Sequence, residues 1–256
     1  MLKNMTRVAL LAIVSLLVAP SVQAQKKAFP FQKRIMSYNT HHCLGMDNRL
    51  DVKRVAEIIK AQYPDVVAIQ ELDSMAKRSH YIYELDEISK YTTYHATYAA
   101  TIPLGSGKYG IGMLTREEPK SVKRIPLPGK EPRMLLVVEL ENFVMACTHL
   151  DLTENGRLES LPIIAKEAKK WKKPFVMAGD WNARPGSKTM NEIGKTFSFI
   201  SALDKDTYDG KAPGACIDYI GLFKNGHKTQ TLNYRVLNEP VASDHFPIVA
   251  DVLFIK

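Results

Sequence analysis

Several strand-like apolar stretches of the chain end in polar side chains of the kinds that hold metal ions or phosphate groups. These ends carry Asn39, Glu71, His149, Asp180 and Asn182, Asp218, and Asp244 with His245. Burying a carboxylate is costly unless it is paired or coordinates a cation, so acids that converge require a positive partner. Donors rich in oxygen and poor in sulfur suit a hard divalent cation such as Mg²⁺, Mn²⁺ or Ca²⁺ better than Zn²⁺. The pattern therefore predicts a metal-dependent site at strand ends.

Each of these residues also has an ordinary structural explanation when it is considered alone. Asn39 and the segment 179–182 could form turns, and Glu71 could be an exposed strand end. His149 could be a satisfied core imidazole, and Asp244 could form a simple ion pair with His245. The combination of all these residues at strand ends favours a functional site over these separate explanations.

Apolar runs with a β-branched bias predict the strands that position these side chains. The runs that lead into or out of the candidate site lie at residues 34–39, 65–71, 174–180, 217–223, 229–236 and 248–255. Between residues 91 and 146, further short runs alternate with glycine and proline, which favours hairpins within one antiparallel sheet.

Apolar residues at helical spacing predict two helices, over 50–61 and 154–171. Pro162 lies inside the second, and a proline in a helix interior costs about 3 kcal/mol, so this helix is expected to start later than its apolar pattern suggests. Helices interspersed with many short strands predict an α/β fold. In this fold, two mixed β-sheets pack face to face and helices flank them, which makes a four-layer sandwich.

The chain of 256 residues has 45% hydrophobic and 24% charged residues, which is typical of globular proteins and excludes disordered, collagenous and coiled-coil classes. No shift in composition marks a boundary, so residues 25–256 are expected to form a single catalytic domain, and nothing in the sequence points beyond a monomer. Three cysteines are too few for a disulfide framework. Cys43, Cys147 and Cys216 are interpreted as small apolar core residues.

The N-terminus has the pattern of a secretory signal peptide over residues 1–24. Lys3 and Arg7 precede an apolar stretch at 8–19, and a small-residue cleavage pattern ends at Ala24. The apolar stretch is well short of the roughly 20 residues that cross a bilayer, so no stable membrane anchor is expected. These features predict a periplasmic or secreted protein. The formal net charge of +8 is compatible with a polyanionic partner.

The order of the polar elements resembles the endonuclease/exonuclease/phosphatase superfamily, which includes DNase I, exonuclease III and bacterial sphingomyelinase. The matching elements are Ser37-Tyr38-Asn39, Gln70-Glu71, Thr148-His149-Leu150, Gly179-Asp180-Trp181-Asn182, Ile217-Asp218-Tyr219 and Ser243-Asp244-His245. They occur in the family's order over nearly the whole chain after residue 24. The resemblance implies a nuclease-like, metal-dependent phosphoric ester hydrolase with the four-layer fold.

The resemblance also implies a metal site. Glu71 would hold a Mg²⁺ ion, for which Mn²⁺ is the alternative, with Asn39 and Asp244 close to it. A phosphoester repels nucleophiles because its oxygens are anionic, so hydrolysis requires a cation and a base that delivers water in line.

The same resemblance assigns roles to the other residues. Asp180 would orient or deprotonate the attacking water, and His149 would stabilise charge that develops on oxygen. His245 would be the general base or a phosphate-binding group, with its tautomer fixed by Asp218. Asn182 would contact the phosphate, together with Asn39. Arg133 could replace an arginine contact that the family has near Cys216, or it could be a solvent-exposed arginine at a sheet edge. The choice between Asp180 and His245 as general base stays open.

The substrate is less closely defined than the chemistry. Cys216 stands where many nucleic-acid-cutting relatives have an arginine nearby, and no tryptophan marks a membrane-entering hairpin like that of the sphingomyelinases. We therefore expect a phosphorylated small molecule first, nucleic acid second and phospholipid third. The alternative function is a non-catalytic protein that uses the same scaffold to capture a phosphorylated or polyanionic ligand.

Overall fold

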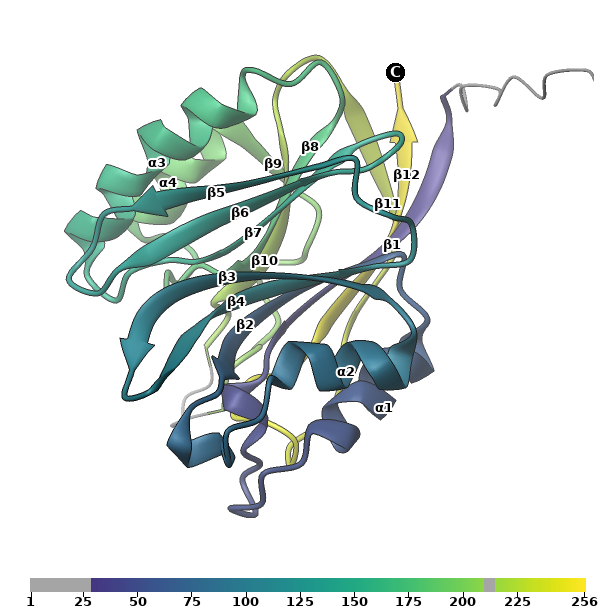
Figure 1. Cartoon of the computed structure of the whole chain (residues 1–256). Helices are drawn as coiled ribbons and strands as arrows, with labels where there is room; N and C mark the ends of the chain where they lie inside the picture. The colour runs from purple at the N-terminus through teal and green to yellow at the C-terminus, as the bar shows by residue number, and fades with distance from the viewer. Residues whose placement is uncertain (1–28, 210–214) are drawn as a thin grey trace, which may run out of the picture.

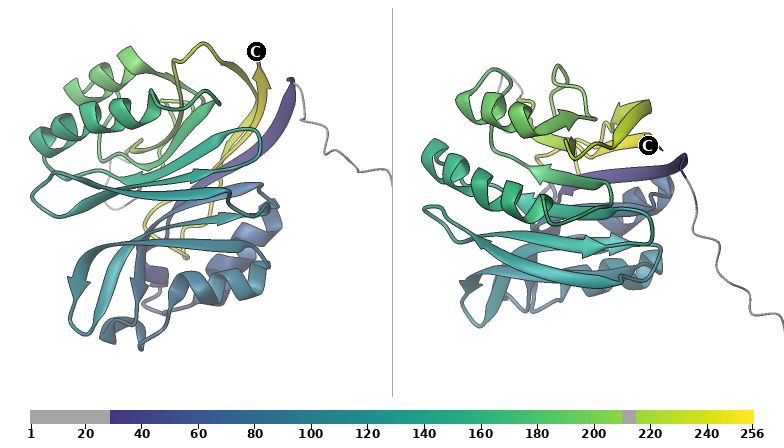
Figure 2. Two further views of the ribbon diagram at one scale, coloured as in Figure 1. Left: turned by 45° about the horizontal axis from the view of Figure 1, so that its top comes forward. Right: turned by 90° about the horizontal axis from the view of Figure 1, so that it is seen from above.

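A computed structural model describes residues 29–209 and 215–256, and two six-stranded sheets packed face to face dominate it (Figure 1). The signal peptide predicted over residues 1–24 lies outside the described residues. The strand order is β11-β12-β1-β2-β4-β3 in the first sheet and β5-β6-β7-β8-β10-β9 in the second. Helices α1 and α2 cover the outer face of the first sheet, and α3 and α4 cover that of the second (Figures 1 and 2). The four-layer α/β sandwich predicted from the sequence is confirmed.

The elements have the following bounds. The first sheet consists of β1 (Phe31–Asn39), β2 (Val66–Ser74), β3 (His95–Leu104), β4 (Gly107–Thr115), β11 (Lys228–Val236) and β12 (Ile248–Ile255). The second sheet consists of β5 (Ser121–Leu127), β6 (Arg133–Glu139), β7 (Val144–His149), β8 (Phe175–Asp180), β9 (Phe197–Phe199) and β10 (Asp218–Phe223). The helices are α1 (Val52–Gln62), α2 (Glu84–Thr92), α3 (Glu154–Ala168) and α4 (Lys188–Thr196).

A parallel strand pair lies at the centre of each sheet and brings polar strand ends together. In the first sheet β1 runs parallel to β2, with Asn39 opposite Gln70. In the second β7 runs parallel to β8, with His149 opposite Asp180. Parallel strands end at the same edge of a sheet, so each pair delivers its C-terminal side chains to one place. Strand β10 begins there too, because it is antiparallel to β8 and pairs Asp218 with Asp180.

Three apolar clusters hold the layers together. The inner cluster fills the space between the sheets and includes Ile35 and Val176. One outer cluster packs α3 and α4 against the second sheet through Ile164 and Ile193, and the other packs α1 against the first sheet through Val55. Because each sheet is buried on both faces, its central strands are fixed on both sides, and their polar ends are held in place.

The single antiparallel sheet expected between residues 91 and 146 is wrong, although its hairpins are correct. β3 and β4 pair in the first sheet, whereas β5, β6 and β7 belong to the second. Both hairpins place apolar residues in the same inner cluster, for example Met113 and Val138. The alternation of apolar and polar residues is therefore the same whether the hairpins share one sheet or belong to two facing sheets.

The later start expected for the second helix is also wrong. α3 begins at Glu154, and the Thr153 hydroxyl accepts a hydrogen bond from the backbone N–H of Gly156 as its N-cap, so Pro162 lies in the helix interior. The helix buries Ile164 and Ala168 against the second sheet, and this packing together with the cap offsets the cost of the proline. The three cysteines are buried and free, as interpreted. None of the described helices is both long and apolar enough to span a membrane.

Candidate active site

The predicted site residues converge at the edge where the central parallel strands end. They surround a cavity of about 280 Å³ between the two sheets. Its lining includes Glu71, Arg133, His149, Asp180, Asn182, Asp244 and His245. The remaining predicted residues, Asn39 and Asp218, are buried and hydrogen-bonded to members of this lining. The structure thus brings together every residue that the sequence proposed.

Asn39 connects the two sheets at the base of the cavity. Its Nδ2 lies 3.1 Å from Oε1 of Glu71, 3.2 Å from Oδ2 of Asp180 and 3.3 Å from Nε2 of His245. The Asn39 Oδ1 accepts a hydrogen bond from the His41 N–H, which fixes the orientation of the amide. Because an amide has two hydrogens, the two carboxylates can take both of them, and Asn39 then has none left for Nε2 of His245.

Glu71 reaches the site because β2 contains a β-bulge. The register against β4 shifts between Ile69 and Leu72, and Glu71 adopts a φ of 60°. A bulge leaves one residue outside the regular ladder and re-aims its side chain. Before the bulge Ile69 packs under the helices, and after it Leu72 returns to the same cluster. Glu71 therefore lies outside the regular alternation of side chains along β2, and the residues on both sides of the bulge keep their apolar packing.

His245 is oriented by a chain of buried hydrogen bonds. Its Nδ1 lies 2.9 Å from Oδ2 of Asp218, and the same oxygen accepts the hydroxyl of Thr207 at 2.7 Å. The Thr207 hydroxyl in turn accepts the backbone N–H groups of Ile217 and Asp218. An ionised Asp218 can only accept, so Nδ1 carries a proton. Burial lowers the pKa of His245, but the nearby carboxylates, Asp218 first and then Asp180 and Asp244, together outweigh burial and raise that pKa to about 10.

Asp180 lies at the centre of the polar network. Its Oδ1 accepts the backbone N–H of Asn182 at 2.8 Å, and its Oδ2 lies 3.3 Å from Nε2 of His149. Burial first, and then the charge of Asp218, raise the pKa of Asp180 to about 7. A carboxylate with a pKa near neutrality can take up a proton during a reaction at physiological pH.

His149 faces this carboxylate as a neutral imidazole. Burial, followed by the positive charges of Arg133 and His245, holds its pKa well below the usual value. Its Nε2 lies 3.3 Å from Oδ2 of Asp180, whereas its buried Nδ1 has no hydrogen-bond partner among residues 29–209 and 215–256. A neutral imidazole can donate a hydrogen bond to a charged oxygen, as the sequence-based role requires.

Arg133 is not the solvent-exposed arginine that a position at a sheet edge suggests. Its side chain is 3% exposed and lines the cavity, where an Nη2 lies 3.0 Å from Oε2 of Glu131. Its Nε is buried without a hydrogen-bond partner in the described part of the chain. A buried guanidinium with a free N–H suits an anionic oxygen, which supports the phosphate-contact assignment.

Asn182 is partly engaged by the backbone. Its Nδ2 donates to the Leu150 carbonyl at 2.9 Å, so the amide nitrogen is already used in this structure. Asp244 lines the cavity beside His245, and the neighbouring Ser243 hydroxyl donates to the Asn39 carbonyl at 2.8 Å. The loop before β12 is thereby attached to the end of β1.

Several residues of the site were missed by the sequence interpretation. Tyr208 places its ring 4.7 Å from that of His245, and Tyr109 and Glu131 complete the cavity wall. Behind the wall, Thr207 orients Asp218. Tyr109 precedes Gly110 and Gly112 on β4, a local pattern that could have drawn attention to it. Thr207 and Tyr208 lie in an irregular segment that has no pattern in the sequence.

The donor set fits a divalent cation. Glu71, Asp180, Asp218 and Asp244 supply carboxylates, and within the described ranges none of these is within 4 Å of a lysine or arginine nitrogen. Asp180, Asp218 and His245 offer ligand atoms within 4.8 Å of one another. Oδ1 of Asp218 is buried without a partner among the residues described. Asp180 and Asp218 are buried and Glu71 and Asp244 are half-buried, and four carboxylates gathered without a lysine or arginine fit a cation that compensates their charge.

Solved structures with the same fold include three informative neighbours. An endonuclease/exonuclease/phosphatase from Beutenbergia cavernae has a TM-score of 0.73 and 20% identity, covering 88% of this chain and 72% of that one. A mannosyl-6-phosphatase from Bacteroides thetaiotaomicron has a TM-score of 0.68 and 16% identity, covering 86% and 99%. ANGEL2, a 2′,3′-cyclic phosphatase, has a TM-score of 0.67 and 17% identity, covering 88% and 95%.

Sequence comparison with family models gives the wider assignment. No curated protein matches the chain. The model of the Endonuclease/Exonuclease/phosphatase family matches residues 36–245, a range that contains every predicted site residue from Asn39 to His245. This match covers most of the chain and agrees with the fold and the site geometry. The chain therefore belongs to the Endonuclease/Exonuclease/phosphatase family of phosphoric ester hydrolases.

Proposed function

We propose that the protein is a secreted or periplasmic, divalent-metal-dependent phosphoesterase that hydrolyses a phosphorylated small molecule as a monomer. The observation that carries this proposal is the convergence of Asn39, Glu71, Asp180, Asp218 and His245 within one hydrogen-bonded network beside a cavity. The signal-peptide pattern of residues 1–24 supports export from the cytoplasm.

The chain's own residues divide the chemistry between them. Glu71 and Asp244 would hold the cation, with Mg²⁺ as the first candidate and Mn²⁺ as the second, because both supply oxygen donors. Asn39 was expected as a further ligand, but its Oδ1 accepts the His41 N–H and its Nδ2 faces Glu71, so it would position this glutamate. A cation bound there would neutralise charge on the phosphate in the transition state. Asp180 orients the attacking water and takes its proton, since its carboxylate lies between the two sheets and its Oδ1 is fixed by Asn182.

The positive groups of the site act on the phosphate. His245 carries two protons, because Asp218 binds Nδ1 and the neighbouring carboxylates raise the pKa of the imidazole to about 10, so the imidazolium attracts an anionic oxygen. Arg133 supplies a second cation, and His149 supplies a neutral donor for charge that develops on oxygen. These assignments make Asp180 the base and His245 a phosphate-binding residue.

A second cavity supports a small organic phosphate as substrate. It measures about 260 Å³ and shares Glu71, Tyr109 and Glu131 with the first cavity. Its other lining residues are His41, His42, Arg78, Ile102 and Leu104. Mixed hydrogen-bonding and apolar groups suit a sugar or nucleoside joined to the phosphate. Two of the structural neighbours are a mannosyl-6-phosphatase and a 2′,3′-cyclic phosphatase, which supports a substrate of this size.

The test is hydrolysis by residues 25–256 of a panel of substrates, with Mg²⁺, with Mn²⁺ and with EDTA. The panel holds hexose phosphates, nucleotides, a 2′,3′-cyclic nucleotide, plasmid DNA and sphingomyelin. We expect metal-dependent release of phosphate from a small substrate, lost in His245→Ala and kept in the control His95→Ala, which changes an exposed histidine on β3. Equal activity in EDTA or in His245→Ala would refute the proposal. Binding of phosphorylated ligands without turnover would favour the non-catalytic alternative.

A further inference from the structure

A second group of titratable side chains, the His42–Asp73–Glu84 cluster, lies outside the phosphoesterase cavity. His42 follows β1, Asp73 lies near the end of β2, and Glu84 is the first residue of α2. Their exposed fractions are 8%, 1% and 0%. Each offers one nitrogen or oxygen donor, and these atoms lie within 4.8 Å of one another. Three elements that are distant in sequence thus place potential metal ligands at one buried point.

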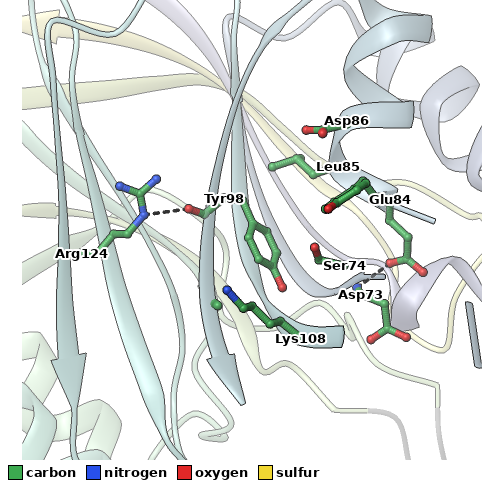
Figure 3. Close-up of a pocket in the computed structure, with 10 residues that line it drawn as sticks. Asp73, Ser74, Glu84, Leu85, Asp86, Tyr98, Lys108 and Arg124 are labelled. Atoms are coloured by element: carbon green, nitrogen blue, oxygen red, sulfur yellow. Dashed lines mark hydrogen bonds between the residues drawn. The ribbon is translucent and has the colours of Figure 1, made fainter. Parts of the chain in front are cut away.

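Two of these donors have unused lone pairs. Oε2 of Glu84 accepts the backbone N–H of Asp73 at 2.7 Å, as Figure 3 shows, but Oε1 is buried with no hydrogen-bond partner within the described ranges. Nδ1 of His42 is likewise buried and unpartnered there. Buried polar atoms nearly always have a partner, and two orphaned acceptors in one cluster indicate a missing ligand that accepts their electron pairs.

The backbone around His42 is held in an unusual conformation. His41, His42 and Cys43 have φ values of 46°, 41° and 57°, so three consecutive residues with a Cβ are left-handed. Each such residue costs roughly 1–2 kcal/mol, and strain of this kind persists where the surrounding structure compensates it. The turn brings the His42 imidazole to the two carboxylates, so a ligand bound there would help to hold the turn.

The charges of the cluster are only partly balanced. Arg78 donates from Nε at 2.7 Å and from Nη2 at 2.8 Å to Asp73, and the Ser79 hydroxyl also binds this carboxylate. An ionised carboxylate has about four acceptor positions, so Asp73 keeps one. Glu84 has no lysine or arginine partner within 4 Å in the described part of the chain. Burial raises the pKa of Glu84 to about 8, and the charge of Asp73 adds to the rise.

His42 is suited to bind a metal ion. Burial first, and then the charge of Arg78, lower the pKa of His42 to about 4, so the imidazole is neutral at physiological pH. Neutral imidazole is the form that ligates metals. One nitrogen and two oxygen donors match a borderline divalent ion such as zinc or manganese better than magnesium, which prefers oxygen alone.

Two cavities adjoin the buried cluster. Asp73 and Glu84 line a cavity of about 500 Å³ beside Tyr98 and Lys108, shown in Figure 3. His42 and Arg78 line the cavity of about 260 Å³ that adjoins the phosphoesterase site. Water in these cavities could complete the coordination of an ion, whereas the donors themselves are almost fully buried.

We propose that His42, Asp73 and Glu84 form a structural site for a divalent zinc- or manganese-type ion, separate from the phosphoesterase cation. Such an ion would join the turn after β1, the end of β2 and the start of α2. The same turn follows Asn39, and the same strand carries Glu71, so the ion would support the backbone of two site residues from beside the cavity that His42 also lines.

The experiment measures metal binding and thermal unfolding of residues 25–256. The full set of proteins is the wild type, Glu71→Gln, Glu84→Gln, His42→Ala, and two controls nearby, Glu87→Gln at a half-buried position and His80→Ala at an exposed one. Each is titrated with ZnCl₂, MnCl₂ and MgCl₂ in separate arms. Glu84→Gln keeps the shape of the side chain and an acceptor for the Asp73 N–H, so it is expected to fold even if His42→Ala does not.

We expect zinc or manganese to raise the Tm of the wild type, of both controls and of Glu71→Gln by about 5–10 °C at saturating concentration. Glu84→Gln should lose this rise, and calorimetry should find one ion fewer than in the wild type. A rise that is unchanged in Glu84→Gln, or that depends on Glu71 alone, would overturn the second site. Because Glu71→Gln removes the proposed catalytic ligand, failure of the phosphoesterase proposal is seen separately, in the activity panel.

Discussion

The two ends of the central strands carry the same kinds of charged residues in opposite arrangements. At the end where β1 begins, acids pair with bases: Arg34 with Asp251 at 2.6 Å, Lys33 with Glu117 at 3.3 Å, and Arg116 with Asp65 at 3.5 Å. At the end where β1 stops, the acids Glu71, Asp180, Asp218 and Asp244 have no lysine or arginine within 4 Å among the described residues.

The difference shows which acids are available for chemistry. Paired, partly exposed charges are already neutralised, and they tie β1 to β12 and to neighbouring loops. The acids at the other end have no lysine or arginine beside them, and among the described residues only His149 and His245 form ion-pair contacts with Asp180 and Asp218. Carboxylates gathered without full compensation are destabilising, so they bind a cation when one is present. Removing an acid should thus affect activity at one end and only stability at the other.

The largest effect is expected for Asp180→Asn, at the end of the sheets where β1 stops. Asparagine keeps the shape and the contact with the Asn182 N–H but cannot take a proton from water. We expect kcat to fall about 10³-fold, measured in steady-state assays with the substrate that the panel identifies. Circular dichroism and Tm should show a folded protein. Activity close to wild type would remove Asp180 from the role of base.

A smaller loss is expected for Asp218→Asn, since Asp218 acts through His245. The variant weakens the 2.9 Å contact with Nδ1 and the stabilisation of the imidazolium, so kcat should fall about 10²-fold. Thr207→Val removes only the hydroxyl that binds Asp218 and should cost about 10-fold. The order of these two effects tests the hydrogen-bond chain, and an equal loss in both variants would contradict it.

At the end where β1 begins, Asp251→Asn should reduce stability and leave kcat unchanged. The hydrogen bond from Arg34 lowers the pKa of Asp251, so its stabilising contribution is present at neutral pH and is lost as pH falls through the folded-state pKa. We expect the free energy of unfolding to drop by about 1–2 kcal/mol at pH 7. Urea titrations should show this difference shrinking below about pH 4. A difference that persists at pH 2 would refute the charge pairing.

The smallest effect is expected for Lys33→Met at the same end. Lys33 lies 3.3 Å from Glu117 and 3.7 Å from Asp65, but surface ion pairs contribute little and methionine keeps the apolar stem. The change in free energy of unfolding should stay within about 0.5 kcal/mol, measured by urea titration at pH 7. A loss above about 1.5 kcal/mol would mean that this pair is structurally important.

The position of the site was predictable because it depends on strand ends. Asn39, Glu71 and Asp180 each follow an apolar run, and the C-terminal ends of parallel neighbours lie at one sheet edge whatever the details of the loops. The order of the elements then matched one family. Residues in irregular segments, such as Thr207 and Tyr208, were not predictable, since a hydroxyl or a ring in a loop has no periodicity to reveal its direction.

The elements that were missed have weak local patterns. α2 and α4 are nine residues each, and few apolar positions fit into so short a helix. The bulge at Glu71 was invisible because it only becomes apparent when β4 is placed beside β2. The burial of Arg133 depends on Glu131 and on the facing sheet, so a single strand cannot show it.

Gly179 has a consequence that extends beyond its own position. Its φ is 150°, and a Cβ there would lie 1.9 Å from the carbonyl oxygen of Thr148 on the neighbouring strand. Any side chain would push β7 and β8 apart, and His149 and Asp180, which lie one residue further along these strands, would separate with them. Glycine is therefore required before Asp180, because only a residue without a Cβ lets β7 and β8 lie close enough to pair His149 with Asp180. A residue whose atoms take no part in the reaction sets the spacing of two that are proposed to do so.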